Sequence, residues 1–198
     1  MKHPEGIANI FPTQIGTYHL DLDKELINSV MQDYKIGPLQ ALDRGNTSFA
    51  LGAASDFGFH PYAHFLFDSR LADLVQNIQF KLNQYTNDLY LEPCKITNSW
   101  FNKMDTDGSV RMHRHNGSVV SGALYINVPD NSSPLVFMDP LNGFKMMELS
   151  RRRFQYEVDI EEGLLLFFPS WLLHETFAQK KPRTVISFNT YHAPATSL

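Results

Sequence analysis

Hydrophobic residues are spaced differently in the two halves of the chain. In the first half, two segments place apolar side chains every three to four positions, which puts them on one face of a helix. These segments are residues 23–34 and residues 69–85. We therefore predict a helix over each, the second capped by Ser69. Between them, residues 45–61 are rich in Gly, Ser and Asn, which predicts a loop.

After Pro93 the pattern becomes that of β-strands. Short runs of apolar and aromatic residues are separated by turn sequences such as Asn-Gly, Asp-Gly and Glu-Gly. The predicted strands are residues 95–104, 119–128, 134–138, 154–158, 163–168 and 183–191. Many short strands at close spacing favour a jelly-roll, cupin-like β fold with the early helices packed on one sheet. We predict one mainly-β domain with helices (α+β) over residues 1–198, with a helical support region at 1–94 and a β core at 95–198.

Composition and charge narrow the classes of protein that the chain can be. The formal net charge of -4 at pH 7 disfavours a nucleic-acid-binding surface, which requires a basic face. A single cysteine, Cys94, excludes an internal disulfide and fits a reducing compartment, so we expect a cytoplasmic protein. The first residues carry no apolar stretch of the signal-peptide kind, and the most apolar run, residues 164–168, is far too short to span a bilayer. We therefore expect neither nucleic acid nor membrane among its partners.

Three histidines in the β half form a candidate metal site. His113 and His115 are two positions apart, so on a strand both side chains point to the same face, whereas Arg114 points away. His174 follows a buried strand and a bend at Pro169, which places it at the end of a second strand. The alternatives are a surface pair of histidines beside a turn and a half-buried structural histidine. Two strands that each deliver histidine at such a point favour a shared metal ion.

Arg183 and Ser187 form a second candidate site. They lie on the last predicted strand, and the two-residue period puts both on one face with Val185 and Asn189. A guanidinium binds a carboxylate through two parallel hydrogen bonds, and the serine hydroxyl adds a third donor. The alternative is a strand-end arginine that extends to solvent. Beside three histidines, this pair indicates a non-heme iron enzyme that uses an oxo-acid cosubstrate.

Several stretches of the chain resemble the Fe(II)/2-oxoglutarate-dependent oxygenase superfamily, most closely its small, poorly characterised branch near the prolyl hydroxylases. They are residues 10–13, 99–102, 108–115, 121–125, 168–175 and 183–189. The resemblance implies a double-stranded β-helix, Fe(II) and 2-oxoglutarate as cofactors, ascorbate as an optional reductant, and dioxygen as a reactant. It also implies a dioxygenase that hydroxylates a peptidyl (prolyl-like) or small-molecule substrate and releases succinate and CO2.

By that resemblance, His113 and His174 match metal ligands, and His115 occupies the position of the family's third ligand, an Asp or Glu. We expect these three histidines to hold the metal, and no further catalytic residue. In an alternative register, His115 is the first ligand and Gly117 takes the vacant carboxylate position. We prefer His113 because Gly108 stands five residues before it, as in the prolyl hydroxylase pattern.

The same resemblance gives a cosubstrate site. Arg183 and Ser187 match the pair that binds the C5 carboxylate of 2-oxoglutarate, and Tyr125 matches a tyrosine on this carboxylate in some prolyl hydroxylases. Ordinary strand packing is the alternative for Tyr125. Two rival functions are a cupin-type metal enzyme without 2-oxoglutarate and a non-catalytic jelly-roll binding module, and the arginine–serine pair favours the oxygenase over both. Residues 45–61 and 139–153 are the predicted lids over the substrate.

Overall fold

The computed structural model of the chain describes residues 12–38, 50–57, 64–141 and 154–193. Its helical elements are α1 (Lys24–Gln32), η1 (Phe65–Phe67), η2 (Ser69–Leu71) and α2 (Ala72–Asp88), where η marks a 3-10 turn. Its strands are β1 (Gly16–His19), β2 (Gly37–Pro38), β3 (Ala50–Ser55), β4 (Cys94–His113), β5 (Val120–Asn127), β6 (Leu135–Met138), β7 (Gln155–Val158), β8 (Leu164–Pro169), β9 (His174–Thr176) and β10 (Arg183–His192).

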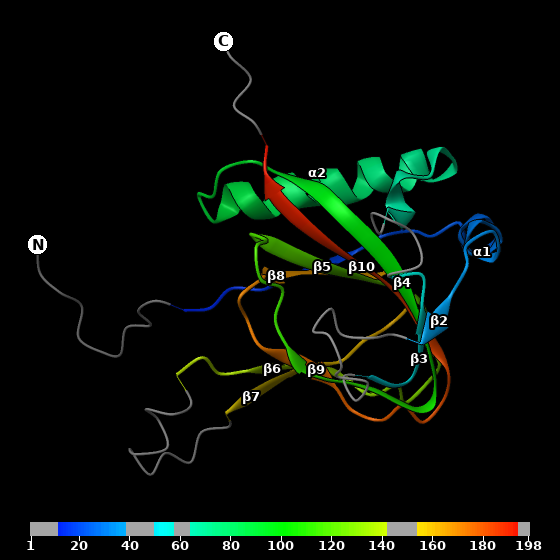
Figure 1. Cartoon of the computed structure of the whole chain (residues 1–198). Helices are drawn as coiled ribbons and strands as arrows, with labels where there is room; N and C mark the ends of the chain where they lie inside the picture. Colours follow the sequence, from blue (N-terminus) through cyan, green and yellow to red (C-terminus); the bar gives the residue numbers. More distant parts are fainter. Residues whose placement is uncertain (1–11, 39–49, 58–63, 142–153, 194–198) are drawn as a thin grey trace, which may run out of the picture.

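The strands form an antiparallel sheet that folds over itself into two layers (Figure 1). The strand order is β1-β8-β5-β10-β4-β9-β6-β7, with β3 paired to β4 and β2 paired to β3. β4 belongs to both layers, because residues 94–104 pair with β10 whereas Val110 and His113 pair with β9. In Figure 1, β8, β5 and β10 lie above β6, β9 and β7. This architecture confirms the predicted mainly-β fold.

The long β4 strand corrects one sequence prediction. Asp107-Gly108 reads as a turn, but the chain continues through it within a strand of 20 residues. Asp107 has a φ of 63°, and a Cβ on Gly108 would lie 2.6 Å from the carbonyl oxygen of Gly52 on β3. The two residues therefore kink the strand and allow a close backbone approach instead of reversing the chain.

β3 corrects a second prediction, because it lies inside the segment 45–61 that the sequence predicts as a loop. It pairs with β4 between Asn102 and Val110. Alanine, glycine and serine have weak strand preference, so pairing with β4 and not local propensity makes this segment a strand. β1, β2 and β9 are also missing from the prediction, since strands of four, two and three residues carry little periodicity. The remaining predicted strands match β5, β6, β7, β8 and β10.

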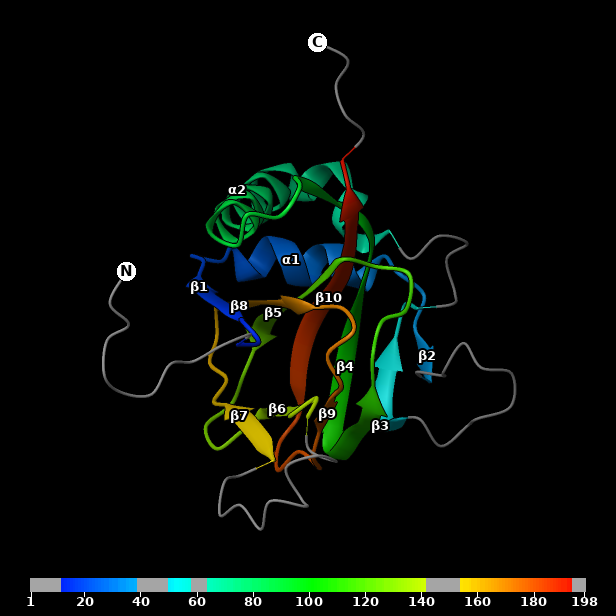
Figure 2. The same ribbon diagram turned by 90° about the vertical axis from the view of Figure 1, so that its left-hand side faces the viewer.

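The two α-helices cover the outer face of the upper layer, as predicted. Figure 2 shows α1 and α2 lying over β8, β5 and β10. Apolar residues of both helices pack with the upper strands in one core, which includes Ile27, Val30, Ile78, Leu82, Leu124, Ile126, Phe167, Ile186 and Phe188. This burial satisfies the apolar stripe that the helical spacing predicts. Among the described residues, no helix has the length and apolar character needed to cross a membrane.

The predicted start of the second helix is wrong in detail. Residues 69–71 form the 3-10 turn η2, and α2 begins only at Ala72 and extends to Asp88. Asp68, and not Ser69, caps the turn, because its Oδ1 accepts a hydrogen bond from the Arg70 backbone N–H at 3.0 Å. A 3-10 turn and an α-helix share a nearly equal apolar spacing over one turn, so periodicity alone does not separate them.

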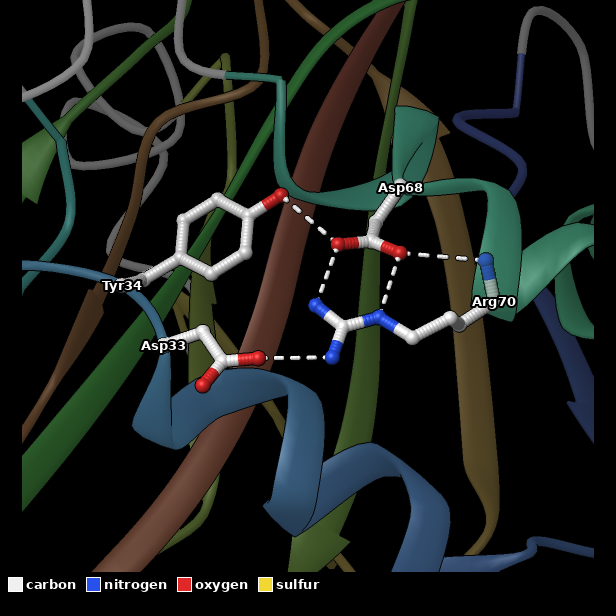
Figure 3. Close-up of polar contacts among 4 residues, drawn as sticks. All are labelled: Asp33, Tyr34, Asp68 and Arg70. Atoms are coloured by element: carbon white, nitrogen blue, oxygen red, sulfur yellow. Dashed lines mark hydrogen bonds and ion pairs between the residues drawn. The ribbon is translucent and has the colours of Figure 1, made fainter.

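An arginine connects the end of α1 to this turn (Figure 3). Arg70 donates from Nη1 to Asp33 Oδ2 at 2.6 Å, and from Nε and Nη2 to the two Asp68 oxygens at 2.9 and 2.7 Å. The Tyr34 hydroxyl donates to Asp68 Oδ2 at 3.4 Å. These bonds, chiefly those from Arg70, hold the pKa of Asp68 down at about 2. The cluster joins the end of α1 to the η2 turn, and as a surface network it contributes little to stability.

Candidate metal and cosubstrate site

The fold brings the three predicted histidines together. His113 is the last residue of β4, His115 follows it by two, and His174 is the first residue of β9. Their ring centroids are 4.2 Å apart for His113–His174, 5.1 Å for His115–His174 and 5.2 Å for His113–His115. One nitrogen of each ring lies within 4.8 Å of the others, so the three can hold one metal ion.

The Nδ1 atom of each histidine is bound to an oxygen acceptor. His113 Nδ1–H donates to the Arg111 carbonyl at 2.8 Å, and His174 Nδ1–H donates to the Leu172 carbonyl at 2.9 Å. His115 Nδ1 lies 2.6 Å from Asn189 Oδ1. Because a carbonyl oxygen only accepts, these contacts assign the proton to Nδ1 and present Nε2 as the lone-pair nitrogen. This is the tautomer that a metal ligand requires.

Burial keeps the three imidazoles neutral. It lowers the pKa of His113 to about 4, with the neighbouring His115 adding to the effect. It also lowers the pKa of His115, and it lowers that of His174 well below its ordinary value with the help of both other rings. Neutral imidazole is the form that coordinates metal. The cluster therefore suits a cation, and no carboxylate of the described residues belongs to it.

A cavity of about 700 Å³ connects the histidines to the second predicted site. Arg183, Val185, Ser187 and Asn189 of β10 all line it, as the two-residue period predicts. Aromatic rings wall the metal end: Trp100 lies 5.8 Å from the His115 ring and Phe168 lies 4.8 Å from the His174 ring, between centroids. The volume is sufficient for a small dicarboxylate and part of a second molecule.

Arg183 is a buried cation in this cavity. It is only 2% exposed, its Nη1 donates to the Ser133 carbonyl at 2.7 Å, and its guanidinium lies 5.6 Å from the centre of the Tyr125 ring. Its Nε has no hydrogen-bond acceptor among the described residues, and no carboxylate there pairs with it. Burial lowers its pKa, but a guanidinium stays charged in proteins, so a cation is buried here without a carboxylate partner among the described residues. A buried guanidinium of this kind is completed by an anionic ligand.

The other predicted cosubstrate residues lie beside this arginine. Tyr125 is fully buried against it and lines the cavity, and burial raises the pKa of its hydroxyl. Ser187 Oγ accepts a 3.4 Å hydrogen bond from Asn102 Nδ2 and also lines the cavity. Gly117, the vacant position of the alternative register, lies in a turn at φ 80° on the same cavity, and no atom of the described residues lies within 4 Å of where its Cβ would stand.

Other polar residues at the site are not identified from the sequence. Asn98 and Asn102 line the cavity, and the Oδ1 atom of each is buried without a partner in the described part of the chain. Ser121 and Asn189 contact His115. Of these four residues, only Asn189 is placed by the two-residue strand period on the same face as Arg183. Most of the two predicted lids, namely residues 45–49, 58–61 and 142–153, lies outside the described residues, as do residues 10–11 of the opening stretch.

Comparison with known proteins relates part of the chain to one enzyme family. A family model described as "Putative 2OG-Fe(II) oxygenase" matches residues 98–189, which span the histidines and the arginine–serine pair. No curated protein matches the sequence.

Solved structures of oxygenases share the fold. A prolyl hydroxylase from Trichoplax adhaerens, solved with a hypoxia inducible factor peptide fragment, has a TM-score of 0.62 at 12% identity, covering 89% of this chain and 83% of that one. A Pseudomonas putida prolyl-4-hydroxylase has a TM-score of 0.57 at 13% identity, covering 91% and 94%. HygX from Streptomyces hygroscopicus, with nickel and 2-oxoglutarate bound, has a TM-score of 0.58 at 12% identity, covering 92% and 84%.

These findings confirm the resemblance seen in the sequence. The structural likeness establishes the double-stranded β-helix, and the family match falls on the segment that holds the candidate site. Fe(II) and 2-oxoglutarate are the cofactors that this family uses, and the histidine cluster can bind the metal. This chain has the sequence signature and the fold of the 2OG-Fe(II) oxygenases.

Proposed function

We propose that the protein is an Fe(II)- and 2-oxoglutarate-dependent dioxygenase that hydroxylates its substrate and releases succinate and CO2. One observation carries the proposal: three neutral, Nδ1-anchored histidines and a buried arginine without a carboxylate partner among the described residues share one cavity. The cavity thus combines a cation site with an anion site. A 2-oxoglutarate molecule, bound to the metal at one end and carrying a free carboxylate at the other, fits both.

In this proposal, His113, His115 and His174 hold the metal, while Arg183 and Ser187 bind the C5 carboxylate with the Tyr125 hydroxyl beside them. Bound Fe(II) and 2-oxoglutarate supply the oxidising chemistry that converts a C–H bond to C–OH with dioxygen. The chain's own contribution is to orient both cofactors and to exclude water. Trp100 and Phe168 exclude water, since both rings are buried at the metal end of the cavity.

We infer a peptidyl (prolyl-like) or small-molecule substrate. Support for the peptide comes from the prolyl hydroxylases among the structures with this fold, one of which is solved with a peptide fragment. Support for a small molecule comes from HygX, solved with hygromycin B bound. A cytoplasmic location and a single-domain organisation remain predictions from the sequence.

One experiment separates this proposal from its rivals. Under anaerobic conditions, Fe(II) and 2-oxoglutarate should together give a weak visible charge-transfer band that neither gives alone. A protein that binds Fe(II) without developing this band on addition of 2-oxoglutarate would be a cupin-type metal enzyme. A protein that binds no Fe(II) would be a jelly-roll binding module. Once the band is established, a substrate screen scored by succinate release would identify the substrate class.

A further inference from the structure

The three histidines are not anchored in the same way. His113 and His174 each donate to the backbone carbonyl of the residue two positions earlier, Arg111 and Leu172. Those acceptors belong to the main chain, so no side-chain substitution removes them. His115 lies beyond the end of β4, and its Nδ1 instead contacts two side chains, those of Asn189 and Ser121. It is also the histidine at the position where the family carries a carboxylate.

A buried polar network surrounds the Nδ1 atom of His115. Asn189 Oδ1 lies 2.6 Å from it and Ser121 Oγ lies 2.9 Å from it. Ser121 donates to Asn189 Oδ1 at 2.7 Å and lies 2.8 Å from Ser170 Oγ. Ser121 and Ser170 are 0% exposed and Asn189 is 8% exposed. The three anchoring side chains come from β5, β10 and the residue after β8, so the network forms only in the folded chain.

The directions of the hydrogen bonds agree with one another. Ser121 uses its single proton on Asn189, so Ser170 must donate to Ser121. A separation of 2.6 Å is short for a nitrogen–nitrogen contact, which favours the amide oxygen of Asn189 facing His115 and a proton on Nδ1. The backbone is fixed as well, since His115 N–H donates to the Ser170 carbonyl at 2.9 Å. Two donors thus converge on one amide oxygen, and each polarises the other bonds of the chain.

We propose that Asn189 and Ser121, supported by Ser170, are positioning residues that allow a histidine to replace the carboxylate ligand. The inference rests on the proposed metal centre. A carboxylate has no tautomers, and either of its oxygens can bind a metal. An imidazole offers a lone pair on the correct nitrogen in only one tautomer and one ring orientation. Asn189 and Ser121 select both, and they leave the ligand neutral because neither is an acid.

The test combines metal affinity with the protonation of the ring. Asn189→Ala should weaken anaerobic Fe(II) binding by about 10–100-fold, the usual effect of losing the partner of a metal-bound histidine. Asn189→Asp keeps the acceptor and should retain the wild-type affinity or exceed it, since a carboxylate makes the imidazole a stronger ligand. Ser121→Ala should lie between wild type and Asn189→Ala. Asn127→Ala is the control, because Asn127 is the last residue of β5, hydrogen-bonds to Asn28 and does not line the cavity; its Fe(II) affinity should be that of wild type.

NMR of the imidazole nitrogens at neutral pH supplies the second readout. Metal-free wild type should show His115 as the Nδ1–H tautomer, and Asn189→Ala should show a mixture. If Asn189→Ala fails to fold, Asn189→Asp and Ser121→Ala still decide, because each must change the His115 resonances while His174 keeps its own. Wild-type protein that binds no Fe(II) would overturn the proposed function. Wild type that binds Fe(II), with Asn189→Ala equal to it and His115 unchanged, would overturn only this inference.

Discussion

His113 lies directly opposite His174 where β4 pairs with β9, and their ring centroids are 4.2 Å apart. Residues that face each other across an antiparallel pair point to the same side of the sheet, so the strand register itself brings these two imidazoles together. Each ring is then oriented by a backbone carbonyl. Two of the three proposed ligands are therefore preorganised by main-chain hydrogen bonds.

His174→Ala should abolish Fe(II) binding and 2-oxoglutarate turnover. The alanine would remove a proposed metal ligand itself, so the loss should exceed the roughly 10–100-fold effect of removing the hydrogen-bond partner of a ligand. Anaerobic Fe(II) titration measures it. His19→Ala is the control, since His19 lies on β1, is largely exposed and pairs with Glu161. Wild-type affinity in His174→Ala would show that this histidine is not a ligand.

His115→Asp should preserve or strengthen Fe(II) binding. In the proposed metal centre, the substitution would place at residue 115 the carboxylate that the resemblance implies, and this carboxylate would neutralise one charge of the ion. The Asn189 side chain should remain hydrogen-bonded in the variant, because Ser121 still donates to its Oδ1 atom. Anaerobic Fe(II) titration measures the affinity of the variant. Weaker binding than wild type would indicate that residue 115 lies outside the metal's coordination sphere.

The sequence predicts which residues share a strand face better than it predicts which segments lie beside one another. The two-residue period places Arg183 and Ser187 on one cavity wall, and it needs no knowledge of the partner strand. The contact between His115 and Asn189 depends on how β10 lies against the turn after β4, which no local pattern records. β3 shows the same limit in the fold, since its small residues form a strand only because β4 lies beside them. Local periodicity therefore predicts the strand face on which a side chain lies, whereas the pairing of strands in the fold determines which residues it contacts.

Asp56 should make stability depend on pH. It is 0% exposed, its Oδ1 accepts from the Phe101 N–H at 2.7 Å, and its Oδ2 has no partner among the described residues. Burial raises its pKa from 3.8 to about 6. Because the folded pKa lies above the unfolded one, its contribution to stability is full below about pH 4 and is lost as the pH rises through about 6. Asp56→Asn should therefore gain about 1–3 kcal/mol over wild type on going from acidic to neutral pH.

Urea unfolding of both proteins across this range measures the gain. The difference between wild type and variant is the informative quantity, since the buried histidines give the wild-type curve an opposing slope. Asp68→Asn is the control. The pKa of Asp68 is lowered to about 2, so its contribution is lost only as the pH falls towards that value, and it should not alter the slope above about pH 4. A stability difference between Asp56→Asn and wild type that stays constant between acidic and neutral pH would contradict the assignment.

Arg183→Ala should weaken 2-oxoglutarate binding by about two orders of magnitude. A buried guanidinium makes charge-assisted hydrogen bonds of roughly 1.5–3 kcal/mol each, two of which would be lost, and water in the vacated space recovers part of them. Arg183→Lys should recover only some of the affinity, because a point charge cannot form the bidentate pair. Fe(II) affinity without cosubstrate should barely change, since Arg183 is not a proposed metal ligand. This affinity serves as the internal control for folding.

Anaerobic titration with Fe(II) gives the metal affinity, and titration of the anaerobic iron protein with 2-oxoglutarate gives the cosubstrate affinity. Equal affinities in wild type and Arg183→Ala would remove the principal support for a 2-oxoglutarate site and would favour the cupin-type enzyme.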